Sequence, residues 1–315
     1  MNLTIGFAHK SYQLAEEYRS RDHGGEILCA RTVEELDSLI DRVDVLCTSG
    51  LWRPAMLAKA TKLRFIQASS SGVEQFDSSA LKARGVRLCN ARGVNANSVA
   101  EHGMALMLSA VRQLALARDR QKKQVWRPLI AARSRREGEL RGKTLAIVGK
   151  GSIGSHLGSL AEAFGMKVIF VRRTESHINI SSVIDREGLH EALGLADFVC
   201  LTCALTDDTR RLIGAHALAS MRPNAWLINL ARGALVDESA LLAALDSGTI
   251  AGAALDCFVE EPLAVDSSFW LRDNVIVTPH SAGETNGFEH RFIDLLEDNL
   301  KRYATSLPLV NEIIT

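Results

Sequence analysis

Three side chains in the second half of the chain have the types that acid–base chemistry on a small acid requires. They follow apolar stretches, with Arg232 in INLARGALVDE, Glu261 in LDCFVEEPL and His280 in VTPHSAG. An arginine can bind a carboxylate and a carbonyl oxygen through paired hydrogen bonds. A histidine can give a proton to a developing alkoxide, and a neighbouring carboxylate would stabilise its imidazolium form. Together the three suit reduction of a 2-oxo acid by hydride transfer.

Each of the three also has an ordinary structural explanation when it is taken alone. Arg232 could form a surface ion pair, Glu261 could be a turn carboxylate before a proline, and His280 could pack within a loop. Structural ion pairs use the same residue types. The hydride-transfer interpretation therefore depends on evidence for a hydride carrier elsewhere in the chain.

A dinucleotide-binding pattern lies in the stretch LRGKTLAIVGKGSIG, residues 140–154. Its apolar run is typical of a strand buried on both faces, and an apolar helical face follows it. Between them, Gly149, Gly151 and Gly154 have G-x-G-x-x-G spacing. In this setting the first glycine makes a tight turn, the second lets the backbone approach a pyrophosphate, and the third packs the helix on the sheet. A dinucleotide site is favoured here over a plain tight turn.

The residues after the next predicted strand indicate which dinucleotide binds. Arg172, Arg173 and Thr174 stand about 18 to 20 residues past the last glycine, where an acidic residue would bind a ribose 2′-hydroxyl. Two guanidinium groups and a hydroxyl suit a 2′-phosphate instead. The alternative is a solvated basic pair at a strand end. The pattern favours NADP, with NAD as the other possibility.

Strand-like and helix-like segments alternate along both halves of the chain, which predicts α/β domains with parallel sheets. Strands are expected at 3–8, 26–30, 43–49, 64–69, 86–90, 144–149, 166–171, 197–203, 225–230, 250–257 and 275–278. Helices are expected at 33–41, 54–61, 97–121, 215–221, 237–246 and 284–303. The closing LPLVNEIIT is expected to pack on the first domain. After the strand at 64–69, the amides of Ser71, Gly72 and Val73 could bind an anion, or form a plain loop.

Composition excludes several classes of protein. The 315 residues hold 37 basic and 37 acidic side chains, so the overall charge does not favour nucleic acid or a membrane surface. No apolar run is long enough for a transmembrane helix, and the start lacks a signal-peptide pattern, so we expect a cytoplasmic protein. The six cysteines are expected to be reduced and buried, without a metal. The basic stretch at 118–143 is expected to be a solvated arm.

The order and setting of these motifs resemble the D-isomer-specific 2-hydroxyacid dehydrogenase family over nearly the whole chain. The resemblance rests on SSSGVEQFD, GVNANSVAEHGMALML, the 140–154 block, FGMKV, LTDDTRRLIG, INLARGALVDE, ALDCFVEEPL and TPHSAG. It implies two doubly wound parallel-sheet domains and a homodimer. A Rossmann cofactor domain, residues 98–283, would be inserted into a flavodoxin-like substrate domain made of residues 1–97 and 284–315.

The resemblance also implies roles for single residues. Arg232, Glu261 and His280 would be the catalytic set. Ser71, Gly72, Val73 and Arg232 would bind the substrate. Cofactor contacts would come from Gly149, Gly151, Ser152, Ile153, Gly154, Arg172, Arg173, Thr174, Leu230 and Asp256. The chain departs from the family pattern at Arg172, which replaces the common acid, at Ala204 and at Arg92, where prolines are usual.

The sequence therefore predicts an NADP-preferring 2-oxoacid reductase that also runs as a D-2-hydroxyacid dehydrogenase. The arginine pair resembles the glyoxylate and hydroxypyruvate reductase branch. Alternatives within the family are an NAD-dependent D-2-hydroxyacid dehydrogenase and a short-form phosphoglycerate dehydrogenase. A formate dehydrogenase-like protein is disfavoured, because it would have glutamine rather than Glu261 at this position. The alternative from another class is a non-catalytic, nicotinamide-sensing binding protein.

Overall fold

The computed structural model describes residues 3–22, 24–172, 183–184 and 188–314. The chain divides into two compact units. The first unit is Met1–Asn95 with Thr285–Thr315, and the second is Ala96–Glu284. Within the described ranges, none of the helices combines the length and the hydropathy that crossing a bilayer requires.

The first unit contains a six-stranded sheet with strand order β13-β5-β4-β3-β1-β2. Its strands are β1 (Ile5–Ala8), β2 (Ile27–Ala30), β3 (Val45–Thr48), β4 (Phe65–Ala68), β5 (Arg87–Cys89) and β13 (Glu312–Ile314). All pairings are parallel except that of β13 with β5, which is antiparallel. The closing segment thus packs on the first domain, as predicted, by adding an edge strand.

Helices cover both faces of this first sheet. One face packs against α2 (Val33–Leu39), α3 (Ser78–Ala83) and the 3-10 turns η1 (Ile40–Arg42) and η2 (Pro54–Ala58). The other packs against α1 (Leu14–Ser20) and α10 (Phe288–Ala304). β1, β3 and β4 are buried along their whole length, which explains why their sequences read as continuous apolar runs rather than alternating ones.

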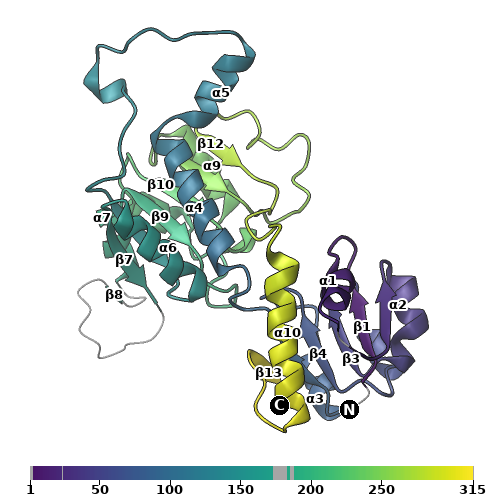
Figure 1. Cartoon of the computed structure of the whole chain (residues 1–315). Coiled ribbons are helices and arrows are strands. Elements are labelled where there is room, and N and C mark those ends of the chain that lie inside the picture. The colour runs from purple at the N-terminus through teal and green to yellow at the C-terminus, as the bar shows by residue number, and fades with distance from the viewer. Residues whose placement is uncertain (1–2, 23, 173–182, 185–187, 315) are drawn as a thin grey trace. The chain divides into compact units, whose positions relative to one another are not determined.

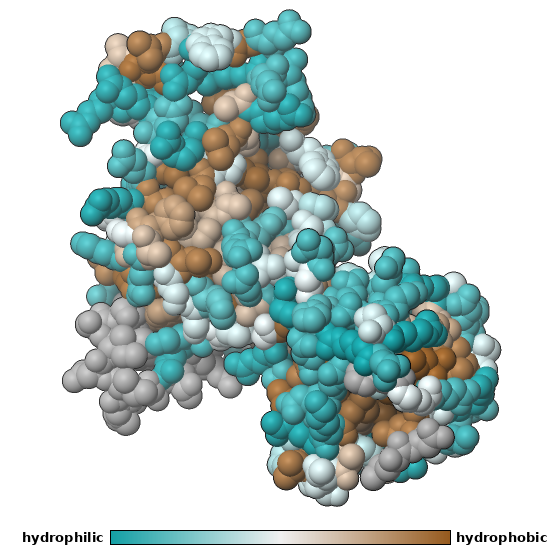
Figure 2. Space-filling model, in the orientation of Figure 1, coloured by the Kyte–Doolittle hydropathy of each residue, from teal (hydrophilic) through white to brown (hydrophobic). Residues whose placement is uncertain are grey.

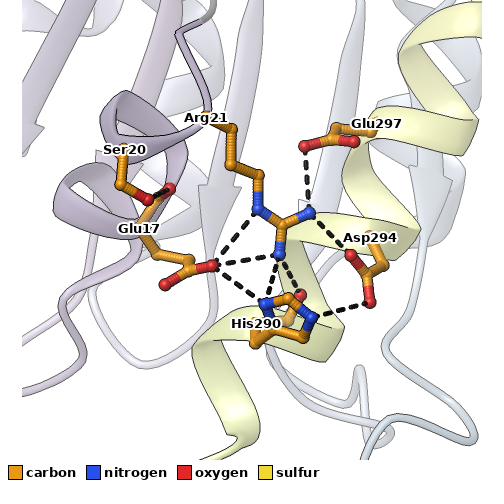
Figure 3. Close-up of polar contacts among 6 residues, drawn as sticks. All are labelled: Glu17, Ser20, Arg21, His290, Asp294 and Glu297. Atoms are coloured by element: carbon orange, nitrogen blue, oxygen red, sulfur yellow. Dashed lines mark hydrogen bonds and ion pairs between the residues drawn. The ribbon is translucent and has the colours of Figure 1, made fainter.

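Arg21, which caps the end of α1, joins α1 to α10 in the first unit (Figure 3). Its guanidinium donates hydrogen bonds to Asp294 at 2.6 Å, and to Glu297 and Glu17 at 3.0 Å. It also donates to the carbonyl of His290 at 2.8 Å. The hydrogen bond from Arg21, followed by that from His290, lowers the pKa of Glu17. One cation therefore holds carboxylates from two helices that are far apart in the sequence.

The second unit contains a seven-stranded sheet with strand order β12-β11-β10-β9-β6-β7-β8. Its strands are β6 (Thr144–Val148), β7 (Lys167–Val171), β8 (Val183–Ile184), β9 (Phe198–Leu201), β10 (Trp226–Asn229), β11 (Gly252–Leu255) and β12 (Val275–Val277). Every pairing described in this sheet is parallel. The chain runs outward from β6 through β7 to β8 and then crosses to β9. β6 is therefore the point where the strand order reverses, and ligands bind at such points in open parallel sheets.

Helices also cover both faces of the second sheet. α4 (Ala96–Val111) and α6 (Ser152–Ala163) pack on one face, where Figure 1 shows them side by side. The other face carries α7 (Leu189–Leu195), α8 (Ala215–Ser220) and α9 (Glu238–Asp246). The predicted fold class, two doubly wound parallel-sheet units, is confirmed.

The prediction of a single long helix at 97–121 is wrong. The structure has α4 and then α5 (Leu114–Lys122), separated at Gln113, which has a left-handed backbone with φ of 53°. The carbonyl of Val111 accepts a hydrogen bond from the Gly138 N–H at 3.0 Å, so a distant segment takes an acceptor of the last turn. The helical pattern of apolar residues, which continues through this region, could not reveal that a distant amide would bind the Val111 carbonyl.

Three smaller expectations also change. α10 begins at Phe288 rather than at residue 284, and the 54–61 helix is reduced to the short 3-10 turn η2. All six cysteines are free, but Cys203 is only partly buried and Cys29 is exposed rather than buried. The strand β2 that carries it lies at the edge of its sheet, where one face is less covered.

The basic stretch after α4 forms an exposed arm of the second unit (Figure 1). α5 has no buried residue among its described positions, and the arm continues through η3 (Arg133–Arg135). Trp126 and Leu129 on the arm are 97% and 98% exposed. Figure 2 shows a largely hydrophilic surface there with isolated hydrophobic patches. The arm is solvated, as the charge pattern predicts.

Candidate active site

The three predicted catalytic residues follow three neighbouring strands of the second sheet. Arg232 comes after β10, Glu261 after β11 and His280 after β12. These strands are adjacent and parallel, so their carboxyl ends meet at one edge of the sheet. This edge is where parallel sheets place their functional side chains.

His280 and Glu261 are in direct contact. The imidazole Nδ1 lies 2.8 Å from Glu261 Oε2 and 3.1 Å from Oε1. An ionised carboxylate only accepts hydrogen bonds, so Nδ1 carries a proton and donates it. Nε2 is then the ring atom that gains or loses a proton. Both side chains are partly open to solvent, 43% for His280 and 38% for Glu261.

The loops that carry Arg232 and Glu261 pack backbone against backbone. A Cβ atom at Gly233 would lie only 1.9 Å from the carbonyl carbon of Phe258, so no larger residue fits there. The Phe258 N–H in turn donates to Glu261 Oε1 at 2.9 Å. The glycine after Arg232 therefore lets that residue approach the turn that orients Glu261. This contact gives Gly233 of the ARGAL stretch a physical role that its sequence alone did not reveal.

Asn229, at the end of β10, shapes the turn into Arg232. It is 1% exposed, accepts from the Ala231 N–H at 3.1 Å and donates to the Arg232 carbonyl at 2.9 Å. The Arg232 guanidinium donates to the Ala231 carbonyl at 2.7 Å. Asn229 was not among the site residues predicted from the sequence, although a short polar side chain at a strand end is a recognisable turn signal.

Asp256 follows β11 and is 1% exposed. Its Oδ1 accepts from the Thr278 hydroxyl at 2.6 Å and from the Ser281 N–H at 3.0 Å, and Oδ2 accepts from the Ala282 N–H at 3.0 Å. Asp256 therefore holds the Thr278 side chain on one side of His280 and two backbone amides on the other. Its predicted contact with a nicotinamide stays a prediction.

The glycine pattern has the shape that a dinucleotide requires. Gly149 has a left-handed φ of 112°, and a Cβ at Gly154 would lie 2.1 Å from the Gly149 carbonyl oxygen. A Cβ at Gly151 would meet nothing within 4 Å, so this position is open. Ser152 and Ile153 begin α6, and no described side chain caps its first turn. Uncapped amides at an open helix N-terminus fit a pyrophosphate.

Arg172 and Lys150 add positive charge beside this loop. Arg172 directly follows β7, and its Nε is buried without a hydrogen-bond partner among the described residues. The Gly149 N–H donates to the Val171 carbonyl at 2.8 Å, so the glycine loop lies next to the end of β7. The Lys150 ammonium sits 4.8 Å from the centre of the Phe170 ring. A buried, unpartnered guanidinium nitrogen fits an anionic ligand. Arg173 and Thr174 lie outside the described residues.

The remaining predicted residues lie in less distinctive settings. Leu230 is 8% exposed and packs on α4, where a Cβ at Gly103 would lie 2.8 Å from it. Ser71, Gly72 and Val73 follow β4 in the first unit, and in the described part of that unit their N–H groups donate no hydrogen bond. The roles predicted for these four residues stay predictions.

Comparison with known proteins identifies relatives over most of the chain. Residues 104–282, which lie within the second unit, match the family model described as D-isomer specific 2-hydroxyacid dehydrogenase, NAD binding domain. A glyoxylate reductase from Thermococcus litoralis is 36% identical over 287 residues, covering 86% of this chain and 82% of the relative. A glyoxylate/hydroxypyruvate reductase B from Yersinia enterocolitica is 35% identical over 269 residues, covering 85% and 82%.

A D-3-phosphoglycerate dehydrogenase from Methanocaldococcus jannaschii is 35% identical over 285 residues and 88% of this chain. The matched part spans only 53% of that relative, about half its length. Among solved structures, an acyclic imino acid reductase in complex with NADPH and D-Arg superposes with a TM-score of 0.85 at 25% identity, covering 99% of this chain and all of that one. The family match assigns a nicotinamide cofactor to the second unit. On these grounds the chain belongs to the D-isomer specific 2-hydroxyacid dehydrogenase family.

Proposed function

We propose that this protein is a 2-oxoacid reductase that prefers NADP(H) over NAD(H) and also runs in reverse as a D-2-hydroxyacid dehydrogenase. The observation that carries the proposal is the His280–Glu261 pair, 2.8 Å apart, at the sheet edge that Arg232 shares. Glyoxylate and hydroxypyruvate are the proposed substrates. The names of the relatives from Thermococcus and Yersinia support this choice.

The chain's own residues supply binding and proton transfer. The Arg232 guanidinium binds the substrate carboxylate and polarises its carbonyl oxygen. In reduction, the His280 imidazolium gives its Nε2 proton to the new alkoxide, while Nδ1 keeps its proton on Glu261. In oxidation, neutral His280 takes the proton back. The Gly149–Gly154 loop would hold the pyrophosphate of the dinucleotide, and the bound cofactor would supply or receive the hydride.

The NADP preference rests on Arg172. Its buried Nε, without a partner in the described residues, is suited to a charge-assisted hydrogen bond with a 2′-phosphate. Lys150 adds a second cation on the neighbouring loop. The NADPH complex of the structurally similar imino acid reductase is in line with this preference.

We also propose a role for each of the two units and an oligomeric state for the protein. The unit at Met1–Asn95 and Thr285–Thr315 serves as the substrate domain, with Ser71, Gly72 and Val73 offering amides to the substrate carboxylate. Ala96–Glu284 serves as the cofactor domain. The protein acts as a homodimer in the cytoplasm.

The test is to follow NADPH absorbance with glyoxylate, hydroxypyruvate, pyruvate, phenylpyruvate and phosphohydroxypyruvate. Binding titrations of NADPH and NADH on the wild-type protein accompany it. We expect turnover with glyoxylate and hydroxypyruvate, and tighter binding of NADPH than of NADH. If the cofactor binds but none of the acids is reduced, the protein is a nicotinamide-sensing binding protein instead.

A further inference from the structure

We propose that His102, on α4, is a positioning residue that fixes the loop carrying His280. The inference rests on the proposed function insofar as His280 is the proton donor. The bonds that carry it all lie within the second unit.

The first bond joins α4 to the strand end before His280. His102 Nε2 lies 3.1 Å from the Thr278 hydroxyl oxygen, across 176 residues of sequence. The same hydroxyl lies 2.6 Å from Asp256 Oδ1. Because an ionised carboxylate only accepts, Thr278 donates its one proton to Asp256. The hydroxyl oxygen must then accept from His102, so Nε2 of His102 carries a proton.

The second step links Asp256 to the backbone around His280. Asp256 is 1% exposed, and it accepts from the N–H groups of Ser281 and Ala282 at 3.0 Å. It thus holds Thr278 on one side of His280 and two amides on the other. His280 itself has a left-handed backbone, with φ of 54°. A non-glycine residue keeps that conformation only where its surroundings hold it.

His102 is placed to anchor this set. Its helix packs on the second sheet through buried residues such as Val99 and Leu106, and its own side chain is 22% exposed. Nε2 lies 3.6 Å from Asp256 Oδ1, and among the described residues His102 is the only cation-capable group within ion-pair distance of that carboxylate. The ordered bonds run from His102 through Thr278 to Asp256 and then to the backbone beside His280. Removing the His102 donor should therefore loosen the backbone beside His280.

The experiment compares His102→Leu, which removes the donor, with His102→Gln, whose side-chain amide can restore it. The matched control is His190→Leu, which breaks a histidine–serine bond of 2.8 Å between α7 and Ser220. For His102→Leu we expect a fall in kcat of about tenfold, with KM and the NADPH Kd within twofold of wild type. His102→Gln should recover most of kcat, and His190→Leu should leave it unchanged.

Amide hydrogen exchange supplies a readout that does not need turnover. In His102→Leu, the amides of Ser281 and Ala282 should exchange several-fold faster, while those of β6 keep wild-type rates. This comparison still tests the positioning role if the wild-type protein reduces no 2-oxo acid, so the two proposals can fail separately.

Several results would overturn the inference. One is a His102→Leu variant with the kcat and the amide exchange rates of the wild type. Another is an equal loss of kcat in His102→Leu and His102→Gln. A third is a loss of NADPH affinity in His102→Leu that matches its loss of kcat. If His102→Leu does not fold, Thr278→Val removes the middle hydroxyl and is measured in the same ways. Unchanged exchange at Ser281 and Ala282 in that variant would equally refute the positioning role.

Discussion

The His280 ring donates from Nδ1 to the Glu261 carboxylate, which leaves Nε2 of the ring free of this contact. Glu261 accepts from the Phe258 amide at 2.9 Å and from His280 Nδ1 at 2.8 Å, through different oxygens. The carboxylate is therefore held by its own turn, and the ring is held by the carboxylate. Nε2 of His280 is left as the atom that exchanges a proton.

His280→Asn should remove this proton donor while its amide nitrogen keeps the bond to Glu261. General acid catalysis contributes about 10²–10⁴-fold, so kcat for glyoxylate should fall by about that factor. The NADPH Kd should stay within twofold, because the glycine loop lies at other strands. Steady-state kinetics measure kcat, and cofactor fluorescence measures the NADPH Kd. A wild-type kcat would remove His280 from the mechanism.

Arg172→Asp should reverse the cofactor preference. Loss of a charge-assisted bond and its replacement by a like charge should weaken NADPH about 10- to 100-fold, on the basis of 1.5–3 kcal/mol per such bond. NADH affinity should hold or improve. Titrations with both cofactors check the ratio.

Arg211→Asp is the matched charge-reversal control, since that side chain is 74% exposed. An equal change in the NADPH/NADH ratio in both variants would refute the phosphate clamp. Lys150→Met extends the test. A loss confined to NADPH would place its ammonium on the 2′-phosphate, and an equal loss for both cofactors would place it on the pyrophosphate.

Two glycines of one motif should respond differently to alanine. A Cβ at Gly154 would lie 2.1 Å from the Gly149 carbonyl, so Gly154→Ala should destabilise the protein by about 1–3 kcal/mol. A Cβ at Gly151 meets nothing within 4 Å, so Gly151→Ala should fold normally but weaken NADPH at least about tenfold. Urea unfolding and cofactor titration separate the two effects. Equal stability losses would contradict the assignment.

The Arg87–Glu312 pair should make the first unit sensitive to acid. The hydrogen bond from Arg87 holds the pKa of Glu312 below its usual value of about 4.5. A carboxylate with a lowered folded-state pKa stabilises the fold above its unfolded value, and loses that contribution as pH falls through the folded one. Glu312→Gln should therefore cost about 1–2 kcal/mol near neutral pH. The difference from wild type should shrink steadily below about pH 4.5. Urea unfolding at pH 7 and pH 3.5 tests this, and an equal gap at both would speak against the pair.

Removing Arg21 should leave three carboxylates facing one another between α1 and α10 (Figure 3). The arginine side chain is only 18% exposed, so Arg21→Met should lower the free energy of unfolding by about 1–3 kcal/mol. Arg302→Met is the control. It breaks an exposed helix pair with Asp298 and a long hydrogen bond of 3.4 Å to the Pro308 carbonyl, and should cost less than about 0.5 kcal/mol. Similar losses in both would show that the Arg21 cluster adds nothing beyond one surface pair.

Local pattern determined the parts of this protein that depend on neighbouring residues. The apolar runs at the β6 and β10 strands, the glycine spacing at Gly149–Gly154 and the parallel-sheet fold class could all be predicted, because strand burial and helix faces repeat every few residues. The positions of Arg232, Glu261 and His280 at strand ends followed from the same pattern. Short helices such as α1 were missed, because seven residues carry little periodicity.

Only the tertiary structure decided which of these side chains meet. The His280–Glu261 contact, the approach of Gly233 to Phe258 and the His102–Thr278 bond each depend on strand order and loop path rather than on local pattern. The break before Gln113 has the same origin, since an amide from residue 138 takes the acceptor of the last helical turn. Windows of a few residues are enough to predict which face of a helix or strand is buried and where the element ends. Partners such as His102 and Thr278, which lie 176 residues apart, are brought together only when the sheet assembles.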